Sequence, residues 1–81
     1  MKLNNVKDID LFVNTVNACE KSVWLTNHDD ATYDLKSVLS MYLAIAKLIG
    51  GEGDRFELFC DSREDEARFI DLFCMNPQMI A

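Results

Sequence analysis

Two periodicities of apolar residues alternate along this chain, and their alternation restricts it to a mixed fold of helices and strands. Three stretches, at 9–19, 38–49 and 63–75, have apolar residues three and four positions apart, as an amphipathic helix requires. The shorter stretches between them alternate apolar and polar residues, which is typical of half-buried strands. Because a chain of 81 residues can bury one core but not two, we expect a single domain over residues 1–81.

Capping and turn residues mark the first half of the expected order of elements. A short strand that contains Leu3 and Val6 comes first, and Asp8 is placed to cap the helix that follows. Residues 22–26 and 31–35 are rich in β-branched and aromatic residues and flank a polar turn, so they predict a β-hairpin. A glycine-rich loop then ends the second helix.

The second half of the chain predicts one more strand and one more helix. Residues 55–60 alternate as a final strand, Asp61 or Ser62 caps the third helix, and Asn76 with Pro77 ends it. The full order is strand, helix, strand, strand, helix, strand, helix. We therefore expect an α+β fold in which three helices cover one face of a four-stranded, antiparallel sheet.

Side-chain alternation predicts which residues face the core. Val23 and Leu25 should point toward the helices and Trp24 toward the open face of the sheet, because adjacent strand residues point to opposite faces. In the expected strand at 55–60, the same alternation predicts that Phe56, Leu58 and Cys60 face the core. On the third helix, the residues expected to share one apolar face are Ala67, Ile70, Phe73 and Cys74.

Composition excludes several classes of partner and site. The formal net charge of −6 opposes binding to nucleic acids and anionic membranes, since phosphate backbones are bound mainly by Lys and Arg. Cys19, Cys60 and Cys74 are too widely spaced for a zinc motif and predict reduced core thiols, without a metal or cofactor. The sequence predicts neither a secretory signal nor a membrane-spanning stretch, so we expect a cytoplasmic protein.

Three short motifs resemble the HPr phosphocarrier family of the sugar phosphotransferase system. Residues 34–39 read DLKSVL and are followed by AIAK at 44–47, and the third helix begins with the acidic pattern ExxA at 64–67. Residues 5–14, NVKDIDLFVN, resemble a shortened subgroup of HPr-like proteins. The resemblance covers about residues 6–73 and implies the βαββαβα, open-faced sandwich of that family, which agrees with the order of elements above.

The resemblance also implies where phosphoryl chemistry and partner binding would lie. Family members that carry phosphate present a histidine before the first helix, whereas this chain has Asn5 and Val6 there, and neither can accept a phosphoryl group. The family's regulatory serine corresponds to Ser37, which is also placed to cap the second helix. The only histidine, His28, is expected to be an exposed residue of the hairpin turn, beside Asp29 and Asp30.

These features predict a non-enzymatic, HPr-like domain that has lost histidine phosphotransfer and binds other proteins. Its expected partners are phosphotransferase-system or regulatory proteins, and its expected binding residues are Lys36, Met41, Tyr42 and Ile45, with Ser37 as a candidate for regulatory phosphorylation. Two alternatives stay open. One is a true phosphocarrier or serine-phosphorylated regulator, and the other is a structural module in which the second helix pairs with its own copy.

Overall fold

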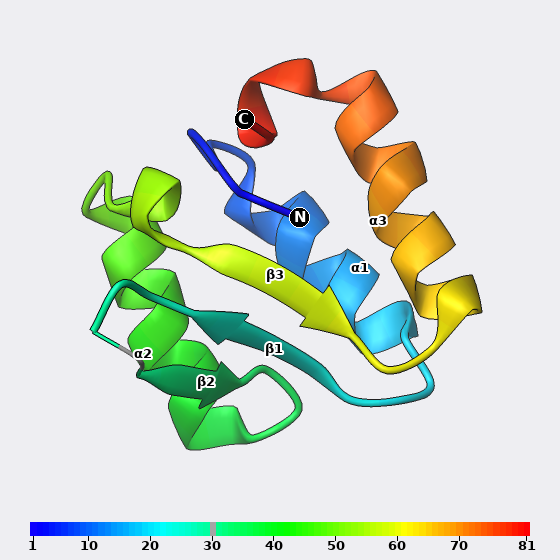
Figure 1. The fold of residues 1–81 in the computed structure, drawn as a ribbon, viewed down its shortest axis with the longest axis horizontal. Coiled ribbons are helices and arrows are strands. Elements are labelled where there is room, and N and C mark those ends of the chain that lie inside the picture. The colour runs from blue at the N-terminus through cyan, green and yellow to red at the C-terminus, as the bar shows by residue number, and fades with distance from the viewer. Residues whose placement is uncertain (30) are drawn as a thin grey trace.

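Three helices and three strands make up the fold of this chain. A computed structural model describes residues 1–29 and 31–81 (Figure 1). The elements in chain order are α1 (Ile9–Ala18), β1 (Val23–Thr26), β2 (Thr32–Asp34), α2 (Val38–Ile49), β3 (Glu57–Cys60) and α3 (Arg63–Met75), with 3₁₀ turns at Gly53–Arg55 and Pro77–Met79. The expected α+β class is confirmed, as are the bounds of the second and third helices. Asp30, expected in the hairpin turn, lies outside the described residues.

The sheet is antiparallel, with the strand order β2-β1-β3. On the central strand β1, Trp24 pairs with Asp34 of β2 on one side and with Phe59 of β3 on the other. Val23 and Leu25 are buried, while the Trp24 and Phe59 rings stack on the open face with centroids 5.9 Å apart. The predicted hairpin and the predicted facing of Trp24 are therefore confirmed.

The expected fourth strand near Leu3 and Val6 is not formed, so the prediction of a four-stranded sheet is not confirmed. Residues 1–3 lie beside β3, where Met1 exchanges two backbone hydrogen bonds with Leu58 and the Leu3 N–H donates to the Phe56 carbonyl. The bridges formed are isolated ones, from Lys2 to Glu57 and from Leu3 to Ile80. The pairing does not extend into a strand, because the next N–H groups, of Asn4 and Asn5, donate to the carbonyls of Met79 and Gln78 and not to β3. The segment instead lies between β3 and the C-terminal residues, as the adjacent chain ends in Figure 1 show.

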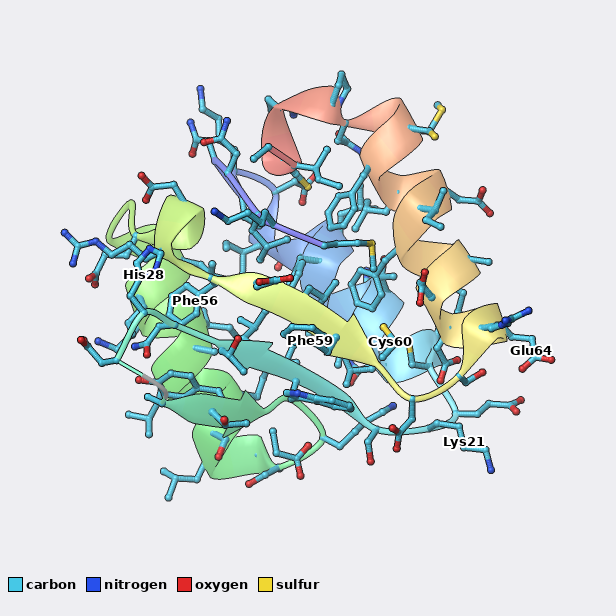
Figure 2. The ribbon with its side chains drawn as sticks, viewed as in Figure 1. Lys21, His28, Phe56, Phe59, Cys60 and Glu64 are labelled. Atoms are coloured by element: carbon cyan, nitrogen blue, oxygen red, sulfur yellow. The ribbon has the colours of Figure 1, made fainter. Side chains whose placement is uncertain are left out.

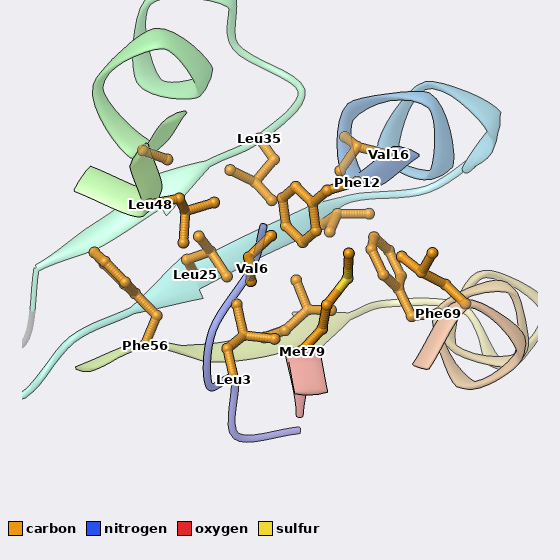
Figure 3. Close-up of a cluster of buried hydrophobic side chains, with 14 of the residues drawn as sticks. Leu3, Val6, Phe12, Val16, Leu25, Leu35, Leu48, Phe56, Phe69 and Met79 are labelled. Atoms are coloured by element: carbon orange, nitrogen blue, oxygen red, sulfur yellow. The ribbon is translucent and has the colours of Figure 1, made fainter. Parts of the chain in front are cut away.

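All three helices contribute to one core behind the sheet. The helix α1 contacts both other helices, α2 packs on β2, and α3 packs on β3 (Figure 1). The Phe12 and Phe69 rings meet at a centroid distance of 5.8 Å, and Leu25 and Met79 fill the space beside them (Figure 3). This core fixes the positions of the helices on the sheet.

The buried face of α3 differs from the one expected. Its buried residues are Asp65, Phe69, Leu72 and Phe73, whereas Ala67, Ile70 and Cys74 are exposed. Of the four residues predicted to share the apolar face of this helix, only Phe73 is buried. The buried residues Phe69, Leu72 and Phe73 form an apolar stripe at helical spacing that overlaps the expected one at Phe73, and Asp65 lies one turn before Phe69 on the same side.

Asp65 fixes the start of α3 to the loop that follows α1. Its two carboxylate oxygens accept hydrogen bonds from the backbone N–H groups of Glu20, at 3.1 Å, and Lys21, at 2.8 Å. The Arg68 guanidinium lies 3.5 Å from the same carboxylate. Burial by itself would raise the pKa of Asp65, but the two N–H donors and the guanidinium together lower it below its ordinary value.

The lowered pKa makes the contribution of Asp65 to stability dependent on pH. A carboxylate whose pKa is lower in the folded than in the unfolded state stabilises the fold above its ordinary pKa, and this stabilisation is lost as the pH falls through the lowered value. We expect Asp65→Asn to lower the melting temperature at pH 7 and the gap from the parent to close as the pH falls below about 4. Thermal unfolding between neutral and acidic pH measures this, with the exposed Asp71→Asn on the same helix as control. Equal melting curves for the two variants at every pH would contradict the account.

Candidate docking surface on the second helix

The helix α2 exposes a continuous apolar surface, which we name the α2 apolar face. Over its twelve residues α2 contains no acidic residue and one basic residue, Lys47, and only Ala44 and Leu48 are buried. Large apolar side chains on the rest of the helix are between 51% and 73% exposed: Val38, Leu39, Tyr42, Leu43 and Ile49. Single exposed apolar residues are ordinary, but a group of this size on one element is typical of interaction surfaces and makes this face a candidate for one.

A shallow hollow between α1 and α2 adjoins this face, and we name it the α1–α2 hollow. It has a volume of about 250 Å³ and is lined by Val13, Asn17, Leu35, Lys36, Val38, Met41, Tyr42 and Ile45. The four residues that the sequence predicted for partner binding, Lys36, Met41, Tyr42 and Ile45, all line it. The structure therefore places these four residues around one hollow.

The ammonium of Lys36 is used in hydrogen bonds within the protein, so it is not a free charge at the edge of the hollow. Its ammonium donates hydrogen bonds to the carbonyl oxygens of Val16, at 2.9 Å, and Cys19. These carbonyls lie at the C-terminal end of α1, where a positive charge complements unpaired carbonyl groups and the helix dipole. Lys36 therefore joins the end of α1 to the start of α2, a role that sequence periodicity does not show.

Ser37 occupies the N-cap position of α2, as expected, but its hydroxyl makes no capping hydrogen bond. The serine backbone contributes instead, because the Ser37 carbonyl accepts from the Met41 N–H at 2.8 Å. The side chain is half-buried. Capping by the hydroxyl was the structural role expected for this serine, and the geometry does not support it.

His28 is exposed in the turn after β1, as expected, but it has neighbours that the sequence did not reveal. His28 lines a hollow of about 160 Å³ together with Lys47, Arg55 and Phe56. Figure 2 shows His28 near Phe56. Asp29 and Glu52 line the same hollow, and Glu52 lies 4.0 Å from the Arg55 guanidinium. The carboxylates offset the two cations, so the hollow is not a strongly positive site.

The place that the HPr resemblance assigns to a phosphorylated histidine is unsuited to phosphate. Val6 is buried in the core, and Asn5 donates its backbone N–H to the Gln78 carbonyl. The start of α1 nearby carries the carboxylates of Asp8 and Asp10, and Asp8 caps the helix by accepting from the Leu11 N–H at 3.0 Å. Negative groups at this end of α1 oppose a phosphoryl group.

The three cysteines differ in burial, which corrects the expectation that all three lie in the core. Cys19 is buried and Cys60 half-buried, but Cys74 is exposed because it lies outside the buried stripe of α3. Burial raises the pKa of the Cys60 thiol to about 11 and also raises that of Cys19, with Asp65 adding to the shift of each. Since the thiolate is the nucleophilic form, neither Cys19 nor Cys60 is prepared for nucleophilic chemistry.

Sequence reasoning did not single out the open face of the sheet as a surface. Trp24 and Phe59 stack there with an interplanar angle of 20°, and Figure 2 shows Phe59 on β3. Beside Trp24 lies a shallow hollow lined by Ser22, Thr32, Asp34 and Asp61. Two aromatic residues at outward positions of neighbouring strands were the available signal, but strand pairing is needed to see that they meet.

The contacts of Lys36 and Ser37 predict opposite results for two neighbouring substitutions. Lys36→Met should lower the free energy of unfolding by about 1 kcal/mol, because it leaves the carbonyls at the end of α1 without their cation. Ser37→Ala should change it by less than about 0.5 kcal/mol, since no capping bond is lost. Denaturant unfolding measures both, with Lys7→Met as the control for loss of an exposed charge. A larger effect of Ser37→Ala than of Lys36→Met would contradict the geometry.

Comparisons with known proteins do not assign the chain to a family. No family model, curated protein or solved structure matches it. None of the helices in residues 1–29 and 31–81 is long and apolar enough to cross a membrane. Within those residues, no three His, Cys, Asp or Glu side chains are grouped so that they could hold a metal ion. The candidate site is therefore defined by its geometry, as an apolar docking surface on α2 with the α1–α2 hollow beside it.

Proposed function

We propose that this chain is a non-enzymatic, HPr-like domain that binds another protein through the α2 apolar face. The observation that carries the proposal is the exposure of five large apolar side chains on one short helix that bears no carboxylate. Burying such side chains against a partner removes apolar surface from water, which drives most protein association. The α1–α2 hollow supplies a concave edge at which a partner side chain can anchor.

The sheet arrangement supports an HPr-like fold. Residues 1–3 lie beside β3, and the bridge between Lys2 and Glu57 is antiparallel. An extension of this pairing by one or two residues would give a fourth strand next to β3 and complete the βαββαβα order that the resemblance implies. The three helices already lie in the order that this arrangement requires.

The residues at the start of α1 support the proposed loss of histidine phosphotransfer. A phosphocarrier needs an exposed imidazole with cationic or amide donors around it. Here Val6 is buried, and the exposed side chains of Asp8 and Asp10 are negative. A domain of this kind would act on its partners by binding alone, as a regulatory module related to phosphotransferase-system proteins.

Regulation at Ser37 remains part of the proposal. The hydroxyl has no capping hydrogen bond to lose, and it precedes Val38, the first residue of the α2 apolar face. A phosphate at this position would add charge at the edge of an apolar surface and oppose its burial by a partner.

Site-specific photo-crosslinking tests the docking surface directly. We expect a photo-reactive phenylalanine analogue at Tyr42 to form covalent adducts with protein in cells that natively produce the chain, because Tyr42 lies in the middle of the α2 apolar face. Mass spectrometry of the adducts identifies what is bound. The matched control places the analogue at Ile70, an exposed apolar residue on α3. Adducts of equal yield at both positions, or no adducts at Tyr42, would contradict the proposal.

A phosphocarrier function is the second candidate, because His28 shares its hollow with Lys47 and Arg55. The carboxylates of Asp29 and Glu52 in the same hollow weaken that candidate. Incubation with phosphoenolpyruvate and the first enzyme of the phosphotransferase system, followed by intact mass measurement, separates the two functions. We expect no phosphorylated species. An acid-labile phosphate that His28→Ala abolishes would establish the phosphocarrier function instead.

A further inference from the structure

We propose that the α2 apolar face binds the same face of a second copy of this chain, with the two α2 helices antiparallel. This inference rests on the proposed function, because it names the occupant of the docking surface described there. Its support comes from the spacing, the sizes and the charges of the side chains on α2.

The exposed side of α2 has the spacing of a helix-pairing seam. Leu39, Tyr42, Ala46 and Ile49 follow one another at intervals of three, four and three residues, and all four are exposed. This is the spacing of the two apolar positions in a coiled-coil heptad, which keeps a stripe of side chains facing a neighbouring helix. The buried residues Ala44 and Leu48 lie on the side of α2 that faces the core, so the seam is free for a partner.

Side-chain sizes along the seam are self-complementary in the antiparallel orientation. When two copies of α2 cross at the level of Ala44, Tyr42 of each copy lies opposite Ala46 of the other, and Leu39 lies opposite Ile49. A large ring therefore meets a small methyl group twice, and two branched aliphatic side chains meet twice. Alternation of large and small residues across an interface is the condition for close packing.

The distribution of charge meets the condition that a two-fold interface imposes on the seam. In a two-fold interface each side chain meets the same patch of an identical molecule, so a charge in the centre would face its own sign. The chain carries 14 acidic residues and a net charge of −6, yet residues 38–49 contain no acid. Lys47, the one charge on α2, is half-buried and lines the His28 hollow on another side of the helix. The seam is thus a neutral stripe on a negative molecule.

The dimer should be weak and reversible. At a rise of 1.5 Å per residue, the twelve residues of α2 give a contact about 18 Å long. Sedimentation equilibrium from about 10 µM to about 1 mM should show the mass of the parent rising from 9.3 kDa toward twice that value.

A charge exchange across the seam tests both the pairing and its direction. Leu39→Glu alone and Ile49→Lys alone should each keep the protein at 9.3 kDa, because each buries an unpaired charge in the seam. The double variant Leu39→Glu with Ile49→Lys should dimerise again, since the new carboxylate of one copy faces the new ammonium of the other. Within one copy the two positions are about 15 Å apart along the helix, too far to pair. Ile70→Glu on α3 is the matched control and should dimerise like the parent.

The masses of the parent and its variants, together with the crosslinks at Tyr42, separate the dimer from the docking function. A parent that stays at 9.3 kDa at all concentrations, or that dimerises equally with the Leu39→Glu and Ile49→Lys single substitutions, would overturn the inference. A parent dimer that both single substitutions abolish and the double variant does not restore would overturn the antiparallel pairing. If the parent is monomeric but crosslinking at Tyr42 still gives adducts with a different protein, the docking function stands and only the second copy is wrong. If the parent is monomeric and crosslinking at Tyr42 gives no adducts, both the docking function and the second copy are wrong.

Discussion

The structure depends on how the C-terminal end of α1 is held. Two charged side chains from distant elements meet the backbone there. The Lys36 ammonium binds the last carbonyls of α1, and the Asp65 carboxylate binds the first free N–H groups of the loop beyond it. One side chain belongs to the segment that starts α2 and the other to the first turn of α3. All three helices are therefore joined at one place, by charged groups whose partners are backbone dipoles.

This junction determines which surfaces remain for function. Because Lys36 fixes the start of α2 against α1, the helix lies on the edge of the core and buries only Ala44 and Leu48. The remainder of an almost wholly apolar helix must then face solvent or a partner. The α1–α2 hollow forms along the same junction, with Lys36 in its wall. The α2 apolar face is thus exposed by the same placement of α2 that Lys36 helps to fix.

Local patterns predicted the elements well, because their causes lie within a few residues. The bounds of α2 follow from its apolar run and the glycines after it, and the outward Trp24 follows from strand alternation. Contacts between distant segments were not predictable in this way. Asp65 is 45 residues from Glu20, and Lys36 is 20 residues from Val16, so neither partnership leaves a periodic signal. Both contacts were missed for that reason. The exposure of Cys74 was missed because α3 has two overlapping apolar stripes that share Phe73, and local spacing does not choose between them.

The sequence predicted several residues of the candidate site, but it did not predict how much of α2 is exposed. Met41, Tyr42 and Ile45 were recognised from the excess of apolar residues on the second helix, and the structure places all three on the α1–α2 hollow. The larger part of the α2 apolar face, including Leu39 and Leu43, was not singled out, because an apolar helix can also be fully buried. Burial is decided by the position of α2 in the fold, which the sequence does not specify locally.

Hydroxyl-radical footprinting tests most directly whether the α2 apolar face is covered by protein. Tyr42 reports on that face, and Trp24, on the open face of the sheet, serves as an internal reference in the same molecule. We expect labelling of Tyr42 relative to Trp24 to fall severalfold in cells compared with the dilute purified chain. An unchanged ratio of Tyr42 to Trp24 labelling would show that the face stays open to water, and it would contradict the central claim.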